Sequence, residues 1–373
     1  MARRGAKRAT GAPAEARGRA LSRGKRPAKP ARPERPPDAD APRRSRPRAA
    51  PEPSALPPPS RRDGSLPLMR APVILSTPST DDYALLDSGD GAKLERCGPV
   101  TVVRPEAQAI WPRRLSPAKW NRADAAFTGA GEDDESETRG RWAFAGPPSE
   151  VWPMRHDGID YFGRFTAFRH IGVFPEQAAH WRWMAERLSD RTRSGDAPSV
   201  LNLFGYTGLA SLVAARAGAE VTHVDASRKA VGWARENAEM AGLADAPIRW
   251  IVDDAAKFVA REERRGRAYD LILLDPPKFG RGPNGEVWHL FEHVAALLSA
   301  CRDILAERPI GIVLTAYAVR ASFYALHGLM GEAMRGMGGT VESGELVIEE
   351  AGADARLLPT SLFSRWVAEG TAG

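Results

Sequence analysis

Short apolar runs alternate with helical patterns along the second half of the chain, from Val200 to about residue 335. Five runs rich in Val, Ile and Leu have the length of buried strands and begin at Val200, Glu220, Ile248, Tyr269 and Ile310. Apolar residues at helical spacing predict helices at 209–217, 227–241, 255–264, 286–305 and 322–334. Strands separated by helices predict an α/β fold with a parallel sheet, which residues 341–350 and 357–367 would close as an antiparallel pair.

The segment before residue 169 has a different pattern, in which short β-like runs are broken by turn residues. The runs between residues 83 and 103 predict a small antiparallel meander, and residues 151–168 predict a hairpin with Asp157-Gly158 at its turn. A helix is expected around residues 181–188. We therefore expect a β-rich front region over residues 66–168, which is a candidate substrate lid, and a sheet domain over residues 169–373.

The first 62 residues differ from the rest in composition. They contain 18 Lys and Arg against 5 Asp and Glu, 13 of the 31 prolines, and almost no large apolar residues. Such a segment cannot bury enough surface to fold alone, so we expect residues 1–65 to be a disordered basic tail. Because the net charge is +6 for the chain and +13 for these residues, the remainder carries −7. Bulk charge therefore does not indicate a nucleic-acid-binding core, although the tail could attract phosphates or be a plain solvated extension.

Other features narrow the class of protein. No apolar stretch has the length of a signal sequence or a membrane span, and prolines in the Arg-rich start argue against a transit peptide. Two cysteines, Cys97 and Cys301, are too few for a disulfide framework or a zinc site. Residues 132–137 predict an acidic surface loop. We expect a cytoplasmic protein without a membrane partner or a metal.

Polar groups follow four successive strands of the expected sheet. The first strand leads into Asn202-Leu-Phe-Gly-Tyr-Thr-Gly208, the second ends on Asp225, the third on Asp253-Asp254, and the fourth runs into Asp275-Pro-Pro-Lys-Phe279. Ligands of open parallel sheets bind outside the carboxyl ends of the strands, so this ordered set predicts a nucleoside-binding crevice. Glycines at positions 205 and 208 would let the backbone turn tightly and approach a ligand.

These residues resemble a class I S-adenosylmethionine-dependent methyltransferase over residues 170 to about 335, and more narrowly the bacterial family that modifies cytosine C5 or guanine N7 of large-subunit ribosomal RNA. Gly172-Val-Phe-Pro-Glu-Gln177 is similar to that family's Phe-x-Asp-Gln element, which borders the cofactor. The resemblance implies a Rossmann-like sheet, S-adenosylmethionine as cofactor and RNA as substrate. The implied cofactor-binding residues are Gln177, Asn202, Phe204, Gly205, Thr207, Gly208, Asp225, Asp254 and Asp275.

Within this set, Asp225 would accept from both ribose hydroxyls, and Asp254 rather than Asp253 would accept from the adenine amine, leaving Asp253 as a surface or capping acid. The catalytic candidates are Asp275, Pro276, Pro277, Lys278 and Phe279. The prolines would direct backbone carbonyls into the crevice, where these carbonyls and the Asp275 carboxylate would hold a target amine. Phe279 would stack on the base or else plug the core, and Lys278 would touch phosphate or a base edge.

The target atom and the substrate class remain open at this point. Methylation of pyrimidine C5 requires a cysteine thiolate, which the cytosine branch carries after the fifth strand, whereas this chain has Leu314-Thr-Ala-Tyr-Ala-Val319 there. A base nitrogen is therefore the favoured target. A methyltransferase of small molecules or proteins would use the same cofactor residues. A nicotinamide-dependent oxidoreductase shares the glycine turn and the acid but would need Gly-x-Gly-x-x-Gly. His170, His180, Trp181 and Trp183 could line a substrate mouth or belong to the core.

Overall fold

The computed structural model describes residues 56–80, 82–129, 140–317, 319 and 321–370. Most of the expected tail and the expected acidic loop at 132–137 lie outside these residues. Residues 56–65, which we expected to belong to the tail, pack against the sheet domain instead. The Leu56 side chain is buried in a hydrophobic cluster, and Arg62 forms a 2.6 Å ion pair with Asp303. This end of the tail is structured because it carries an apolar residue and a cation with partners.

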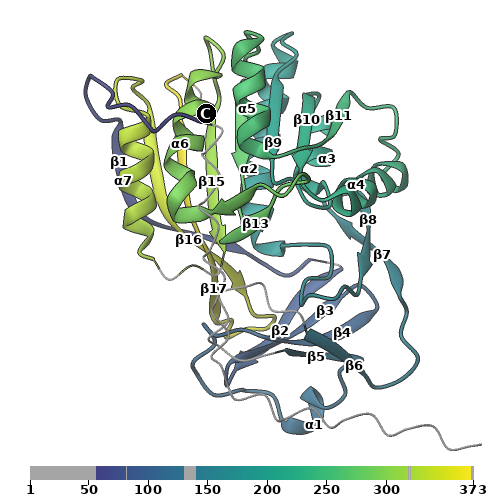
Figure 1. Ribbon diagram of the computed structural model, residues 1–373. Helices are drawn as coiled ribbons and strands as arrows, with labels where there is room; N and C mark the ends of the chain where they lie inside the picture. Colours follow the sequence, from purple (N-terminus) through teal and green to yellow (C-terminus); the bar gives the residue numbers. More distant parts are fainter. Residues whose placement is uncertain (1–55, 81, 130–139, 318, 320, 371–373) are drawn as a thin grey trace, which may run out of the picture. The chain divides into compact units, whose positions relative to one another are not determined.

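The main sheet is mostly parallel and has the order β1-β16-β17-β15-β12-β9-β10-β11 (Figure 1). Its strands are β1 (Leu68–Thr77), β9 (Ser199–Leu203), β10 (Glu220–Asp225), β11 (Ile248–Val252), β12 (Leu271–Leu274), β15 (Gly311–Tyr317), β16 (Thr340–Glu349) and β17 (Leu357–Val367). Only β17 runs antiparallel to its two neighbours. The expected Rossmann-like sheet with a C-terminal antiparallel pair is therefore confirmed.

Two helical layers enclose this sheet. One contains α2 (Ala178–Arg193), α3 (Leu209–Arg216) and α4 (Arg228–Met240), and the other α5 (Ala255–Arg264), α6 (Leu290–Asp303) and α7 (Phe323–Ala333). Serine side chains cap the first turns of α4 and α7. Ser227 Oγ accepts from Ala230 N, and Ser322 Oγ accepts from Tyr324 N, both at 3.2 Å. The expected helix at 286–305 begins only at residue 290, because β14 (Val287–His289) pairs with β13 (Phe279–Arg281).

The front region forms a second, five-stranded sheet with the order β2-β3-β4-β5-β6. Its elements are β2 (Tyr83–Gly89), β3 (Ala92–Cys97), β4 (Val100–Pro105), the short helix α1 (Pro117–Trp120), β5 (Ala125–Gly129) and β6 (Gly140–Phe144). A separate hairpin, β7 (Val151–His156) and β8 (Ile159–Arg164), turns at Asp157 and Gly158, both with positive φ. The 3-10 turn η1 (Pro175–Gln177) leads into α2. β1 differs from expectation: it joins the main sheet beside β16 rather than the front region.

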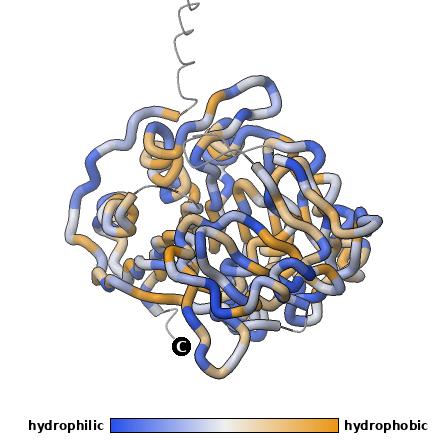
Figure 2. The backbone as a smooth tube through the Cα atoms, turned by 90° about the horizontal axis from the view of Figure 1, so that it is seen from below, coloured by the Kyte–Doolittle hydropathy of each residue, from blue (hydrophilic) through white to orange (hydrophobic). Residues whose placement is uncertain are grey.

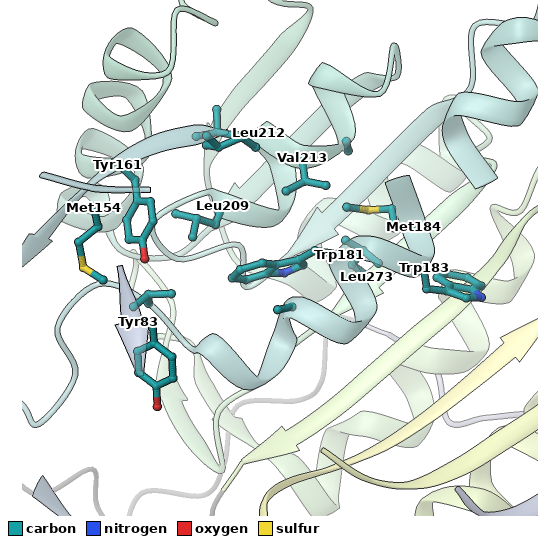
Figure 3. Packing of buried hydrophobic residues seen from close by; sticks show 14 of the residues in the cluster. Tyr83, Met154, Tyr161, Trp181, Trp183, Met184, Leu209, Leu212, Val213 and Leu273 are labelled. Atoms are coloured by element: carbon teal, nitrogen blue, oxygen red, sulfur yellow. The ribbon is translucent and has the colours of Figure 1, made fainter. Parts of the chain in front are cut away.

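The front sheet and the main sheet share one hydrophobic cluster. Tyr83 of β2, Met154 and Tyr161 of the hairpin, and Trp181 and Leu209 of the sheet domain are all buried in it (Figure 3). The cluster therefore joins the front region to α2 and α3. It gives the front region an apolar contact that a hinged lid would have to expose.

Buried charges reinforce this contact. The Arg356 guanidinium lies 2.7 Å from carboxylate oxygens of both Asp87 on β2 and Glu350, and Ser88 Oγ donates to Glu350 at 2.6 Å. The side chains of Asp87 and Glu350 are only 1% and 4% exposed. Breaking such pairs leaves uncompensated charge away from water, so we interpret the front sheet as a fixed wall rather than a moving lid.

Hydrophobic and hydrophilic residues alternate along the backbone of the described chain (Figure 2). Within the described residues, no helix combines the length and the apolar character needed to cross a bilayer.

The shared cation gives the first testable prediction. Arg356→Met is expected to lower the free energy of unfolding, measured by urea denaturation, by about 3–5 kcal/mol, because it removes the nearest cation of two buried carboxylates. The control is Arg193→Ala, whose pair with Asp190 has side chains 73% and 60% exposed, and which should change stability by less than about 0.5 kcal/mol. Equal losses in the two variants would contradict the role given to Arg356.

Candidate functional site

A cavity of about 70 Å³ lies at the carboxyl ends of β9, β12 and β15. Trp181, Met184, Leu209 and Leu273 form an apolar part of its lining and lie together in Figure 3. The structure brings six of the predicted site residues to this cavity, namely Gln177, Asn202, Phe204, Gly205, Thr207 and Asp275. The other predicted residues, Gly208, Asp225, Asp254 and Pro276–Phe279, do not line it.

The turn after β9 has an unusual backbone. Phe204 and Tyr206 adopt left-handed conformations with φ of +57° and +48°, which are rare for bulky residues and mark a strained functional turn. Gly208, with φ of +85°, uses the freedom expected of a glycine. Gly205 is required for another reason: a Cβ there would lie 2.4 Å from the His223 ring. The expectation that both glycines supply the turn is therefore right for Gly208, whereas Gly205 supplies space.

Two of the predicted cofactor residues, Asn202 and Thr207, form hydrogen bonds that stabilise this turn. Asn202 Nδ2 donates to Ser211 Oγ at 2.9 Å, and Ser211 Oγ lies 3.0 Å from His223 Nδ1. Burial lowers the pKa of His223 to about 3, so its ring is neutral. Thr207 Oγ1 donates to the Gly172 carbonyl at 2.6 Å. The side chains of Asn202 and Thr207 thus hold the turn against its neighbours.

Asp225 ends β10 and binds the same turn from the side. Its Oδ2 accepts from Tyr206 N at 2.9 Å, and its Oδ1 accepts from Ser227 N at 2.7 Å at the start of α4. Burial raises the pKa of the Asp225 carboxyl, and the two backbone N–H groups oppose that rise. Each carboxylate oxygen has a second lone pair for a hydroxyl donor. Asp225 therefore orients the left-handed Tyr206 and could still accept from a ligand.

The two acids after β11 both take part in local contacts at the start of α5. Asp254 is the N-cap of α5, and its Oδ1 accepts from Lys257 N at 3.0 Å. Asp253 accepts from the Asp254 backbone N–H and pairs with Arg261. Of the two expectations for Asp253, a surface acid or a capping acid, the second is excluded, because β11 ends at Val252 and Asp254 is the residue directly before the helix.

A chain of polar side chains crosses the cavity at Asp275. Gln177 Nε2 donates to Thr315 Oγ1 at 3.1 Å, and the Thr315 hydroxyl donates to Asp275 Oδ1 in a short hydrogen bond. Burial raises the pKa of Asp275 to about 6, while the bond from Thr315 favours its charged form. The three residues come from η1, β15 and the end of β12. A carboxyl group poised near neutral pH beside a strained turn is a candidate catalytic group.

The β13–β14 hairpin folds back on the segment after Asp275. The Pro277 carbonyl accepts from Trp288 Nε1 at 2.7 Å, and the Lys278 carbonyl accepts from Leu290 N at 3.0 Å. Each of these carbonyls keeps a second lone pair, so the expected contact between a carbonyl of this segment and a target amine stays a prediction. The Phe279 ring lies 4.9 Å from the His289 ring within that hairpin.

Sequence reasoning missed several residues at the cavity. Glu176 is 2% exposed beside Gln177, and burial raises its pKa to about 7. Thr315 carries no motif of its own. Phe174, Tyr206 and Tyr317 form ring contacts above the cavity that only the folded chain brings together. His180, at 3% exposure, also lines the cavity, whereas Trp183, at 8%, is buried in the core and does not line it. Among the described residues, no group of three or more His, Cys, Asp or Glu is placed to hold a metal ion.

Comparisons with known proteins show the family of this chain. Residues 132–301 match the family model of S-adenosylmethionine-dependent methyltransferases. A ribosomal RNA large subunit methyltransferase I from Aeromonas salmonicida is 36% identical over 147 residues, covering 37% of this chain and 32% of that protein. A ribosomal RNA large subunit methyltransferase K/L from Shewanella frigidimarina is 36% identical over 151 residues, covering 40% and 20%. The chain thus matches a third or less of the length of these two curated relatives.

Solved structures extend the match to most of the chain. A methyltransferase complexed with SAH shares the fold, with a TM-score of 0.57 at 18% identity over 77% of this chain and 76% of its own. The SAM-dependent methyltransferase from Agrobacterium tumefaciens is 56% identical, with a TM-score of 0.78 over 83% of this chain and 98% of its own. A likeness of that extent establishes the family. The chain belongs to the S-adenosylmethionine-dependent methyltransferases.

Proposed function

We propose that this methyltransferase transfers the methyl group to a nitrogen atom of an RNA base. The observation that supports this most directly is the Gln177–Thr315–Asp275 chain of hydrogen bonds, which holds a carboxyl group with a pKa of about 6 at the end of the cavity. Two relatives of the sheet domain are named ribosomal RNA large subunit methyltransferases, which supports RNA, and ribosomal RNA in particular, as the substrate.

The residues present fit S-adenosylmethionine. A cavity of about 70 Å³ can enclose only part of the cofactor. Gly205 lines this cavity and, having no side chain, lets the backbone lie at the cavity edge. Asp225 and Asp254 stand at the carboxyl ends of the next two strands, where a ribose and an adenine amine would find acceptors. We assign Gln177, the 202–208 turn, Asp225, Asp254 and Asp275 to cofactor binding on this basis.

When bound, the cofactor supplies a methyl group on a sulfonium, which leaves by in-line displacement and so needs positioning more than covalent catalysis. Asp275 Oδ1 is held by Thr315, which fixes the plane of the carboxylate and leaves Oδ2 to accept from the target amine. A carboxylate so placed orients the nitrogen and can take the proton that it releases.

The cysteines argue against a carbon target. The chain has two of them: Cys97 on β3 and Cys301 in α6. Both are buried, and burial raises the pKa of each thiol far above its ordinary value. A buried neutral thiol cannot add to a pyrimidine ring, so neither supplies the nucleophile that methylation at C5 requires.

Cofactor binding is tested first through Asp225. Wild-type protein should bind S-adenosylmethionine in calorimetry and show no comparable heat with a nicotinamide dinucleotide. Asp225→Asn should weaken S-adenosylmethionine by about 10- to 100-fold, because a hydrogen bond to a charged group is lost. The control is Asp245→Ala, an exposed acid in a loop, which should bind as wild type. Unchanged affinity for Asp225→Asn, with an unchanged melting temperature, would refute the ribose role.

The role of Asp275 is tested by pH. Because only the carboxylate accepts from the amine, kcat/KM should rise with pH through an apparent pKa near 6. Thr315→Val removes the donor that favours the charged form, so the apparent pKa should move upward. Asp275→Asn should lose most turnover, because an amide cannot take the proton that the target nitrogen releases. A profile that is flat from about pH 5 to 7, or a downward move in Thr315→Val, would contradict this role.

The target atom is tested by removing both thiols. The double variant Cys97→Ala/Cys301→Ala should keep kcat within about twofold on large-subunit ribosomal RNA from a strain lacking the enzyme. Mass spectrometry of nucleosides from that reaction should show a methyl group on nitrogen. A 5-methylpyrimidine product would overturn the nitrogen assignment. Methylation of a small molecule or a protein, with none of RNA, would overturn the RNA substrate.

A further inference from the structure

Four aromatic side chains meet above the cavity: His170, Phe174, Tyr206 and Tyr317, here termed the aromatic cluster. The ring centroid of Phe174 lies 4.7 Å from that of His170, 5.7 Å from that of Tyr206 and 5.8 Å from that of Tyr317. The rings of His170 and Tyr317 are 5.9 Å apart. All four side chains are only partly buried, which is unusual for a group of rings that could otherwise form core.

The cluster borders the reacting end of the site. Phe174 and Tyr206 line the cavity together with Asp275 and Thr315. Tyr317 lies two residues beyond Thr315 on β15, and side chains at that spacing share one face of a strand. The hydroxyl of Thr315 contacts Asp275, so Tyr317 stands further out along the same wall. Phe174 separates the outer rings, His170 and Tyr317, from the glycine turn.

The Arg169 guanidinium lies beside the outer rings, and the front sheet contacts the same segment. The Arg169 guanidinium lies 5.2 Å from the centroid of the Tyr317 ring. Arg104 of the front sheet donates to the Arg169 carbonyl at 3.2 Å, which anchors this segment to the buried pair between Arg104 and Glu95. Burial, together with Glu106, raises the pKa of Tyr317, so the phenol stays neutral. The front sheet thus helps to position Arg169 and, through it, Tyr317.

Phe279, the ring first expected to stack on the base, is placed differently. It belongs to β13, its ring contacts His289, and it does not line the cavity. A base needs a ring beside the carboxylate that holds its amine, and RNA-binding sites combine such rings with guanidinium groups. We propose that Tyr317, backed by Phe174 and flanked by His170 and Arg169, is the stacking surface for the target base. This inference rests on the proposed RNA substrate.

The test compares Tyr317→Leu with Phe279→Leu, using large-subunit ribosomal RNA from a strain lacking the enzyme. Tyr317→Leu should raise the KM for RNA by about 10- to 100-fold, the range expected for loss of one base–aromatic stack. Its affinity for S-adenosylmethionine and its melting temperature should match wild type. Tyr317→Phe, which keeps the ring, should restore the KM. His170→Leu serves as a second variant if Tyr317→Leu does not fold, and a raised KM is expected there too.

The outcomes separate the two proposals. Wild-type KM in Tyr317→Leu, or a raised KM in Phe279→Leu alone, overturns the stacking role while leaving an RNA methyltransferase. A parallel loss of cofactor affinity in Tyr317→Leu also overturns it, because the residue would then be structural. Cofactor binding by the wild type without methylation of RNA overturns the proposed substrate and the stacking role with it.

Discussion

The site depends on one steric constraint, the absence of a side chain at Gly205. The His223 ring fills the space that a Cβ would need, and its Nδ1 lies 3.0 Å from Ser211 Oγ, which accepts from Asn202. Because the backbone can lie directly on the imidazole, the chain leaves β9 through two left-handed aromatic residues rather than continuing outward. That path exposes the backbone to the cavity and aims Tyr206 at the aromatic cluster. Backbone strain of this kind persists only where surrounding contacts determine it.

Three carboxyl groups then acquire different properties from their surroundings. Asp225 receives two backbone N–H groups, Asp254 caps a helix, and Asp275 receives one hydroxyl. Burial raises the pKa of all three carboxyls, and the donors around each group oppose that rise. For Asp275 the pKa is raised to about 6, and its one donor is the Thr315 hydroxyl. The same residue type thus has a different set of donors at each strand end: two backbone N–H groups, a helix start or a side-chain hydroxyl.

Local patterns were sufficient to predict the sheet and the strand-end acids. The apolar runs, the helix starts near Ser227 and Ser322 and the order of the acids depend on residues close in sequence, which is why they could be predicted from it. Other features depend on distant partners. β1 has many exposed side chains and pairs with a strand near the other end of the chain, so its place in the main sheet has no local signature. The occupied Pro277 carbonyl, the aromatic cluster and the His223 contact likewise arise between segments that only the fold brings together.

The pairing of β1 with β16 has a consequence for biosynthesis. During translation β1 leaves the ribosome before any other strand of the main sheet, whereas β16 and β17, which connect it to β15, emerge last. The nascent chain therefore carries β1 without its partner until the residues of β16 have been made. Unpaired strand edges promote association between chains. The topology thus separates β1 from its partner by almost the whole of the described chain, so β1 is the first strand of the main sheet to be made and one of the last that can be paired.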